Sequence, residues 1–271
     1  MLIAQITDTH IKMPGKLAYK MVDTAGMLRT AIEHLVALPT QPDLIVHTGD
    51  LVDFGTPQEY AYIREILAPL QVELIVIPGN HDERGALAQA FADGGYLPTS
   101  GFLNFCIRRG PLAIVGLDTV VPGQGGGKVC AERLSWLEQT LAANRDVPTL
   151  VLMHHPPFAT GIAHMDAIGL EGRDEFAAIV ARHRQIQAIL CGHVHRSINA
   201  LVGGRLAMIS PSVAHQVALD LTPDGPSAFR MEPPGYMLHK WDGNRLVSHV
   251  AVIGGWPGPF PFFDADGRLI D

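Results

Sequence analysis

Short apolar runs alternate with longer amphipathic segments along the first 195 residues of this chain. Five of the runs have the length of buried strands: residues 2–6, 44–47, 74–77, 149–153 and 188–190. Five of the longer segments have the apolar period of a helix: residues 27–38, 57–67, 83–92, 131–143 and 175–182. Strands that alternate with helices in this way form parallel sheets with the helices packed outside. The pattern therefore predicts an α/β fold.

The pattern changes after residue 195, where apolar runs follow one another without helices between them. We expect strands at residues 206–210, 213–219, 236–241 and 245–253. Asp242-Gly243-Asn244 predicts a hairpin turn between the last two. Another strand pair is expected at residues 102–107 and 112–117. Antiparallel strands that close a parallel set predict two facing mixed β-sheets flanked by helices.

The length of 271 residues allows one large domain with an appendage. We predict a core in residues 1–200, antiparallel strands in residues 201–253 that complete it and add cap or dimerisation elements, and an arm in residues 254–271. The arm is rich in Gly, Pro and Phe. It is either disordered or packed on a neighbouring chain, and its aromatic content favours packing, since exposed aromatic surface is unfavourable. This predicts a homo-oligomer, either a dimer or larger.

Composition and charge restrict the function further. There are 20 Lys and Arg against 27 Asp and Glu, and the net charge of −7 argues against general nucleic-acid binding. Apolar stretches fall short of the roughly 18 residues of a membrane span, and the first residues do not resemble a signal peptide. The three Cys have no disulfide spacing, and Cys191 is expected to be a small buried apolar residue. We therefore expect a cytoplasmic protein.

Seven side chains with oxygen or nitrogen donors follow the predicted strands. Each lies beside Gly, Pro or a turn former: Asp8, His10, Asp50, Asn80, His154, His193 and His195. The carboxyl ends of parallel strands share one edge of a sheet, so these donors are expected to meet there. Any one of them alone is more often a turn former, a helix cap or a structural histidine. The ordered set outweighs that interpretation and predicts a metal site.

The donor types indicate which metals are expected. Imidazole together with carboxylate suits Mn, Fe, Co or Zn rather than Ca or Mg alone. Seven donors are too many for one tetrahedral zinc, but they suit two metals that share a carboxylate. Two divalent cations with Asp8, Asp50 and a bridging hydroxide carry a charge of about +1, which fits a phosphodiester monoanion. Two metals roughly 3.5–4 Å apart generate hydroxide near neutral pH and hold the attacking and leaving oxygens.

The sequence resembles calcineurin-like metallophosphoesterases in five blocks, which span most of the first 195 residues. The blocks are Asp8-Thr9-His10, Gly49-Asp50-Leu51-Val52-Asp53, Gly79-Asn80-His81-Asp82, His154-His155-Pro156-Pro157 and Gly192-His193-Val194-His195. The early Asp8, the paired histidines and residues 211–216 are similar to the branch that contains bacterial glycerophosphodiesterases and class III cyclic-nucleotide phosphodiesterases. The resemblance implies the four-layer αββα sandwich of the family.

The resemblance also implies two overlapping ligand sets. One metal would be held by Asp8, His10, Asp50 and His195. The other would be held by Asp50, Asn80, His154 and His193. Asp50 would bridge the two.

The remaining site residues are also implied by the resemblance. His81 would contact the phosphate and protonate the leaving alkoxide, with Asp82 orienting it as a second catalytic residue. Asn80 and His215 would contact the substrate as well. His155 is expected to orient or pack rather than bind metal.

One position departs from a related pattern. Purple acid phosphatases carry a Tyr three residues after the bridging Asp, whereas this chain has Asp53. The departure predicts no tyrosinate colour and favours divalent pairs of Mn, Fe, Co or Zn.

The expected activity is hydrolysis of small phosphodiesters, either glycerophosphodiesters or 3′,5′-cyclic nucleotides, by a metal-activated hydroxide. The alternative is a phosphomonoesterase, a protein phosphatase or a nuclease of the same superfamily, and the acidic net charge weakens the nuclease. A non-catalytic scaffold is a third interpretation, but a scaffold does not need a complete ligand set.

Overall fold

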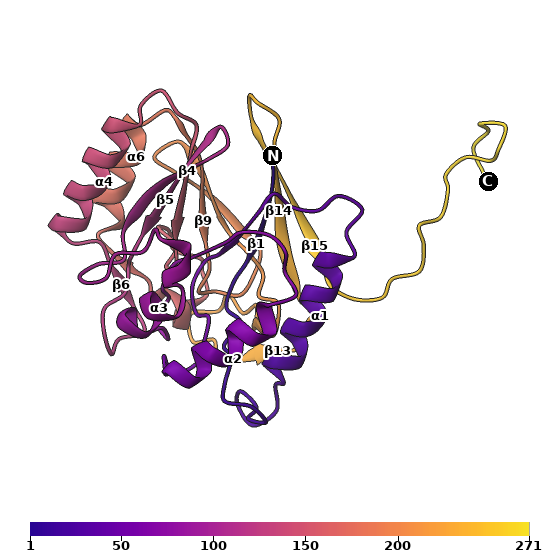
Figure 1. Ribbon diagram of the computed structural model, residues 1–271, viewed down its shortest axis with the longest axis horizontal. Coiled ribbons are helices and arrows are strands. Elements are labelled where there is room, and N and C mark those ends of the chain that lie inside the picture. The colour runs from indigo at the N-terminus through magenta and orange to yellow at the C-terminus, as the bar shows by residue number, and fades with distance from the viewer. Residues whose placement is uncertain (271) are drawn as a thin grey trace.

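The computed structural model describes residues 1–270. Its elements form four layers, with two β-sheets facing each other and helices outside both (Figure 1). In chain order the elements are β1 (Leu2–Ile6), α1 (Thr24–Val36), β2 (Leu44–His47), α2 (Pro57–Leu67), β3 (Leu74–Val76), α3 (Arg84–Ala90), η1 (Ala92–Gly94), β4 (Phe105–Arg109), β5 (Leu112–Leu117), β6 (Gly127–Lys128), α4 (Ala131–Ala143), β7 (Thr149–Met153), α5 (Ala163–Asp166), β8 (Leu170–Glu171), α6 (Arg173–Arg182), β9 (Ile186–Cys191), β10 (Ile198–Val202), β11 (Arg205–Ile209), β12 (Gln216–Val217), β13 (Phe229–Arg230), β14 (Gly235–Trp241) and β15 (Leu246–Val252).

The first sheet has the strand order β15-β14-β1-β2-β3. Strands β1, β2 and β3 run parallel, as the strand–helix alternation predicts. Strand β14 pairs antiparallel with β1 and with β15. The chain therefore returns from its second half to complete the sheet that its first residues began.

The second sheet has the strand order β10-β11-β9-β7-β5-β4. Strands β5, β7, β9 and β11 run parallel, while β4 and β10 are antiparallel edge strands. Two mixed sheets flanked by helices confirm the predicted fold class. The carboxyl ends of β7 and β9 lie at the same rim as those of β1 and β2, as the hydrogen bond from Gly192 N–H to the His154 carbonyl and that from His193 N–H to Asp8 illustrate.

Two strand predictions in the second half are corrected. Strand β11 runs parallel to β9, because an unpredicted hairpin through Gly203-Gly204, with φ of 55° and 76°, adds β10 outside it. Residues 213–219 are not a long strand, since only β12 is extended there. The Ser212 hydroxyl accepts from the N–H of Ala214, and local bonds of this kind compete with a sheet ladder.

Apolar side chains fill three layers. The layer between the sheets includes Ile3, Val46, Leu150 and Leu190. A second layer packs α1 and α2 on the first sheet, and a third packs α4 and α6 on the second (Figure 1). Each sheet is covered by helices on one face and by the other sheet on the other. The parallel strands are therefore buried on both faces, which explains why their sequences are continuous apolar runs.

Local signals set the ends of the helices. Helix α2 begins with a capping box, in which the Thr56 hydroxyl accepts from Glu59 N–H and the Glu59 carboxylate accepts from Thr56 N–H, and Pro57 occupies the first turn. Helix α1 begins earlier than the apolar period predicts, because the Asp23 carboxylate caps it by accepting from Gly26 N–H.

The arm leaves the body of the molecule after β15 (Figure 1). Its aromatic side chains are exposed, among them Phe260 at 74% and Phe262 at 79%. The predicted packing is therefore not made by this chain on itself, and the last position of the arm, residue 271, lies outside the described residues. None of the described helices is long and apolar enough to cross a membrane.

Candidate metal centre

The seven predicted donors all lie at one rim of the two sheets. The loops after β1 and β2 run side by side there, since Asp8 N–H donates to the Gly49 carbonyl at 3.0 Å and His10 N–H donates to the Asp50 carbonyl at 3.1 Å. The loop after β9 joins them, because His193 N–H lies 3.1 Å from both carboxylate oxygens of Asp8. Backbone bonds thus bring donors that lie far apart in the sequence to one place.

Strained backbone marks these loops. Among the described residues other than glycine, seven have positive φ, and five of the seven are predicted ligands: Asp8 (53°), His10 (42°), Asp50 (53°), His193 (74°) and His195 (56°). Positive φ in a non-glycine residue costs on the order of 1–3 kcal/mol and gathers at functional sites. The strained backbone therefore coincides with the predicted ligands.

One group of donors surrounds the end of β1. His10 Nε2 lies 3.1 Å from His195 Nε2, and His195 Nε2 lies 3.4 Å from an Asp8 carboxylate oxygen. His10 Nε2 also lies 3.6 Å from Asp50 Oδ2. These are the side chains expected around the first metal, and we call them the His10 group.

The second group lies on the other side of Asp50. His154 Nε2 is 3.3 Å from Asp50 Oδ2 and 3.1 Å from Asn80 Oδ1. His193 Nδ1 is 3.0 Å from the same Asn80 oxygen. We call these side chains the His154 group. Asp50 Oδ2 lies between the two groups, which is the place that a bridging carboxylate occupies.

Hydrogen bonds to backbone carbonyls fix the tautomers of three of the histidines. His154 Nδ1 contacts the Thr48 carbonyl at 2.8 Å, His195 Nδ1 contacts the His215 carbonyl at 3.1 Å, and His193 Nε2 contacts the Ile168 carbonyl at 3.1 Å. A carbonyl can only accept, so each ring donates from that nitrogen and points the other one into the site. This arrangement is typical of metal-binding histidines.

The donor set fits metal ions. With Nδ1 of His195 acting as donor, its Nε2 presents a lone pair to His10 Nε2, only 3.1 Å away and beside the Asp8 carboxylate. The Asp53 carboxylate, 3.3 Å from His10 Nδ1, favours the His10 ring proton on that nitrogen, so His10 Nε2 presents a lone pair as well. Facing lone pairs and a carboxylate repel one another unless a cation lies among them. The oxygen and nitrogen donors match Mn, Fe, Co or Zn.

The protonation of the site agrees with a place for cations. Burial alone would raise the pKa of Asp8 and of Asp50, but neighbouring histidines outweigh burial and lower both. Burial lowers the pKa of His193 to about 3, which leaves that ring neutral. Burial opposes protonation of His154 as well, yet Asp50 raises its pKa to about 9. The carboxylates at the rim thus remain ionised and attract positive charge.

His81 is oriented by Asp53 rather than by Asp82. His81 Nδ1 donates to the Asp53 carbonyl at 2.9 Å, and the Asp53 carboxylate lies 3.7 Å from the same nitrogen. The Asp53 carboxylate also lies 3.3 Å from His10 Nδ1 and pairs with Lys12. Nε2 of His81 is left free on a ring that lines the cavity.

The Asp82 carboxylate faces away from this contact. It accepts hydrogen bonds from Leu51 N–H at 3.2 Å, Gly79 N–H at 2.9 Å and the Tyr60 hydroxyl at 2.8 Å. Burial, with a contribution from Asp50, raises the pKa of Asp82 to about 7. Its contacts join the loop after β2 to the loop after β3, which corrects the predicted orienting role.

His155 packs behind the His154 group. Its Nε2 donates to the Gly125 carbonyl at 3.1 Å, and its Nδ1 lies 2.8 Å from the Thr119 hydroxyl. Both ring nitrogens are therefore engaged away from the cavity, although the ring centroid lies only 4.5 Å from that of His193. A Cβ at Gly127 would overlap the His155 ring, so a residue without a side chain is required there.

A cavity of about 340 Å³ opens onto both donor groups. His215 lines it, with its ring centroid 4.7 Å from that of His195. Tyr19 and Phe229 add an aromatic wall next to His215, with centroids 4.9 Å apart. Further lining comes from the segment that contains Met165. The predicted substrate residues Asn80, His81 and His215 all line this cavity.

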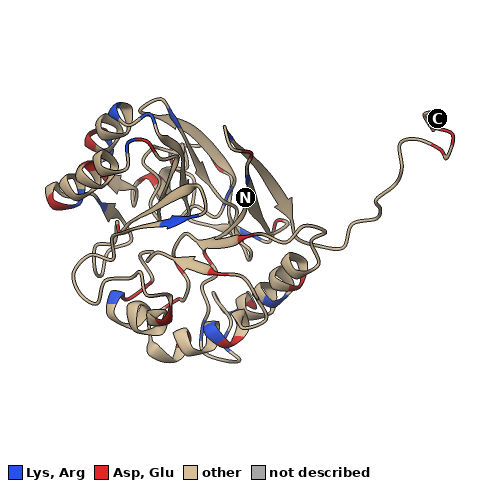
Figure 2. Ribbon diagram, turned by 45° about the horizontal axis from the view of Figure 1, so that its top comes forward, with Lys and Arg blue, Asp and Glu red and all other residues tan. Residues whose placement is uncertain are grey.

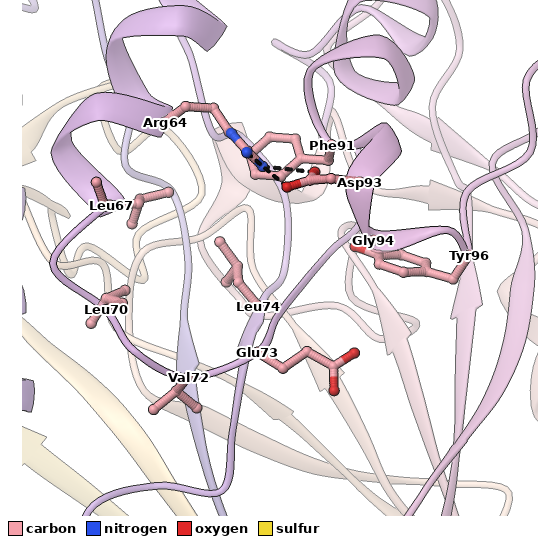
Figure 3. A pocket seen from close by; sticks show the side chains of 11 residues that line it. Arg64, Leu67, Leu70, Val72, Glu73, Leu74, Phe91, Asp93, Gly94 and Tyr96 are labelled. Atoms are coloured by element: carbon pink, nitrogen blue, oxygen red, sulfur yellow. Dashed lines mark hydrogen bonds and ion pairs between the residues drawn. The ribbon is translucent and has the colours of Figure 1, made fainter.

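A second hollow of about 370 Å³ lies beside the edge strand β3 (Figure 3). Arg64 and Asp93 at its mouth pair with each other at 2.8 Å, and Leu67, Leu74 and Tyr96 line it. Among residues 1–270 no cluster of possible metal ligands reaches this hollow. The smaller cavity at the rim therefore carries the chemistry.

Comparison with known proteins agrees with this geometry. A family model described as calcineurin-like phosphoesterase matches residues 1–197. The chain belongs to the calcineurin-like phosphoesterase family. The prediction of a phosphoester hydrolase of this family is thereby confirmed.

Similar proteins identify the branch of the family. A probable glycerophosphodiester phosphodiesterase, GpdQ, of Arcobacter nitrofigilis is 40% identical over 100% of both chains. A cAMP/cGMP dual specificity phosphodiesterase of Mycobacterium tuberculosis is 33% identical over 94% of this chain and 80% of its own. The predicted branch is confirmed. A dimetal phosphatase from Danio rerio superposes with a TM-score of 0.68 over 93% of this chain and 98% of its own, and at 14% identity this similarity concerns the fold alone.

Several residues at the site escaped the sequence analysis. The spacing of Asp53 from Asp50 indicates only that a Tyr is absent there, and it does not indicate that Asp53 orients His81. Thr48 and Ile168 act through backbone carbonyls, which no residue type reveals. Phe229 belongs to the short strand β13, which is placed at the cavity by its pairing with β12.

Proposed function

We propose that this phosphoesterase hydrolyses small phosphodiesters, either glycerophosphodiesters or 3′,5′-cyclic nucleotides, at a dinuclear metal centre. The observation that carries the proposal is the position of Asp50. Its Oδ2 lies 3.6 Å from His10 Nε2 and 3.3 Å from His154 Nε2, and Asp50 is a buried residue that lines the cavity. One carboxylate oxygen is thus shared by two donor groups that face the same space.

The His10 group, with Asp8, Asp50 and His195, would hold one metal. The His154 group, with Asp50, Asn80 and His193, would hold the other. When bound, two divalent ions supply a nucleophile by lowering the pKa of water and offset negative charge on the phosphate. The chain itself holds the ligands in place through backbone carbonyls and excludes water by burying the rings.

His81 would act on the leaving group. Its Nδ1 is committed to the Asp53 carbonyl, so Nε2 is the atom that can give a proton to a departing alkoxide. Burial opposes protonation of His81, but Asp50 and Asp53 outweigh it and raise the pKa above its usual value. His215, which lines the same cavity, would contact the phosphate or its substituent.

The lining of the cavity supports a small diester substrate. It includes no Lys or Arg from residues 1–270, so anionic substrates would depend on the metal charge rather than on basic side chains. This suits a monoanionic phosphate with an uncharged organic group beside Tyr19 and Phe229. Along the outer helices Lys and Arg are interspersed with Asp and Glu (Figure 2), which supports a small-molecule substrate over a nucleic acid.

The test is steady-state hydrolysis by protein reconstituted with Mn²⁺, Co²⁺ or Zn²⁺. Bis(p-nitrophenyl) phosphate, cyclic nucleotides and glycerophosphodiesters are expected to be hydrolysed with higher kcat/KM than p-nitrophenyl phosphate or DNA. Asn80→Ala and His81→Ala are expected to lose most of this activity. The proposal would be overturned if the protein hydrolysed no diester, or if both variants kept full activity. A higher kcat/KM for monoesters than for diesters would favour a phosphomonoesterase.

We further propose a cytoplasmic homo-oligomer that assembles through residues 254–271. The exposed aromatic side chains of the arm support this, because they find no cover on their own chain. A dimer or larger assembly would bury them against a second copy.

A further inference from the structure

A fully buried amide lies behind the metal centre, between the two sheets. Gln5 is on β1 and shares a face with Ile3, which belongs to the apolar layer between the sheets. An amide in such a layer is unfavourable unless every polar atom finds a partner. The position calls for an explanation, because a leucine would fill the same space without that requirement.

Gln5 satisfies all of its polar atoms, and its two donors go to different sheets. Nε2 donates to the Thr48 hydroxyl at 3.0 Å, just past β2 of the first sheet. It also donates to the Cys191 carbonyl at 2.9 Å, at the end of β9 in the second sheet. Oε1 lies 3.0 Å from His239 Nε2, which therefore donates. The orientation of the amide is fixed, since the Cys191 carbonyl can only accept.

Both residues that accept hydrogen bonds from Gln5 Nε2 are connected to His154. The carbonyl of Thr48 accepts from His154 Nδ1 at 2.8 Å and so sets the orientation of the ring. The residue after Cys191 is Gly192, whose N–H donates to the His154 carbonyl at 3.0 Å. Gln5 thus links the Thr48 segment to the Cys191–Gly192 segment, and each segment accepts from or donates to His154.

We infer that Gln5 is a positioning residue for the His154 group: its buried amide fixes the spacing of the two sheets at the rim and thereby the affinity of the metal held by His154. This rests on the proposed dinuclear centre. The His10 group is linked to Gln5 less directly, through the His193 N–H that donates to the Asp8 carboxylate. The effect is therefore expected to be largest at the metal held by His154.

The experiment measures Mn²⁺ binding by calorimetry and by metal analysis after dialysis. Asn80→Ala identifies which equivalent occupies the His154 group, because Asn80 contacts only that group. Gln5→Leu is expected to weaken that equivalent by about 10- to 100-fold, the usual effect of losing a residue that orients a metal ligand. The other equivalent is expected to be weakened less, and equal weakening of both would mean that Gln5 does not act on the His154 group in particular. Excess Mn²⁺ should restore most of kcat, while KM for the diester stays unchanged.

Two further variants separate positioning from a general loss of stability. Thr48→Val removes one acceptor of the bridge, and is expected to weaken the same equivalent; combined with Gln5→Leu it should add little further loss. Leu112→Ala makes a cavity in the same apolar layer between the sheets. Leu112 is the first residue of β5 and so lies at the end of the strand away from the metal centre. It is expected to lower the Tm without changing either metal affinity.

The outcomes distinguish this inference from the proposed function. A wild-type protein that binds fewer than two Mn²⁺ per chain would refute the dinuclear centre itself. A wild-type protein that binds two, with Gln5→Leu and Thr48→Val binding both at unchanged affinity, would overturn the role of Gln5 alone. Equal weakening by Leu112→Ala would also overturn it, because the effect would then be one of stability.

Discussion

His81 donates a hydrogen bond from Nδ1 to the backbone carbonyl of Asp53 at 2.9 Å. Because the acceptor is a carbonyl, the bond fixes the tautomer and leaves Nε2 for the substrate. The Asp53 side chain meanwhile contacts His10 Nδ1, at 3.3 Å. One residue thus orients a proton donor with its backbone and a metal ligand with its side chain.

His81→Ala should therefore lower kcat without changing metal content. A lost general acid costs about 10²- to 10⁴-fold, and the loss should be largest for alkyl leaving groups, which need protonation most. For p-nitrophenolate esters the loss should be smaller. His249→Ala, on exposed β15, is the control and should behave as the wild type. Equal losses for both kinds of leaving group would argue against proton transfer by His81.

Metal binding should stabilise the fold. Five predicted ligands have positive φ, and this backbone strain lowers the free energy of unfolding of the metal-free protein. Bound ions would offset that loss, because they bind only to the folded chain. At a free concentration 100 times the Kd, each bound ion contributes about 2.7 kcal/mol. Mn²⁺ added to chelator-treated protein should thus raise the Tm in calorimetry, whereas Ca²⁺ should not, since imidazole ligands disfavour it. A similar Tm shift with both ions would contradict a specific site.

The sequence predicts the position of the donors well, and the reason is topological. The carboxyl ends of parallel strands in one sheet share an edge, so Asp8 and Asp50 could be placed together from the strand pattern. His154 follows β7 of the other sheet, so its place beside them depends also on how the two sheets face each other. The same reasoning predicts the two mixed sheets. The pairing of β14 with β15 followed from the hairpin signal at Asp242-Gly243-Asn244, but that signal did not predict the pairing of β14 with β1.

Contacts that depend on backbone atoms or on local strain could not be predicted in this way. The Asp53 carbonyl and the Thr48 carbonyl orient histidines, yet a carbonyl carries no signature of its residue type. The segment around residues 213–219 has strand-like composition, but local hydrogen bonds hold it in a loop: the Ser212 hydroxyl accepts from Ala214 N–H, and the Gln216 amide donates to the Ser212 carbonyl. The arm forms a local turn in which Ile270 N–H donates to the Phe262 carbonyl and Asp264 N–H donates to the Arg268 carbonyl, and its Gly, Pro and Phe content does not predict this turn.

Gly127 should be far less tolerant of substitution than its neighbour Gly125. A Cβ at Gly127 would overlap the His155 ring, whereas a Cβ at Gly125 would make ordinary contact with Ile168 at 3.5 Å. Gly127→Ala is expected to displace His155 against His193 and to lower stability by about 1–3 kcal/mol, the usual cost of overpacking. Gly125→Ala is the matched control, because it keeps the carbonyl that His155 contacts. Denaturant unfolding compares them, and equal stability of the two variants would be the contrary result.

Removal of residues 254–271 should reduce the oligomer. The exposed Phe260 and Phe262 are expected to be buried against a second copy, so their loss leaves the interface incomplete. Light scattering on the truncated chain should give a smaller mass than on the full chain. Replacement of both Phe by Ser in the full-length chain tests the aromatic contribution separately. An unchanged mass in both would show that the arm does not hold the assembly together.

His239 should make stability depend on pH at a distance from the metal ligands. Burial lowers its pKa from 6.5 to about 3 in the folded chain. Between these values the unfolded chain binds the additional proton, so the contribution of His239 is present above about pH 6.5 and is lost as pH falls toward 3. The slope is at most about 1.4 kcal/mol per pH unit. Urea unfolding compares the wild type with His239→Phe across this range. The wild type should lose stability relative to the variant as the pH falls, because the variant lacks the titrating group. A constant difference in unfolding free energy would mean that His239 does not titrate with folding.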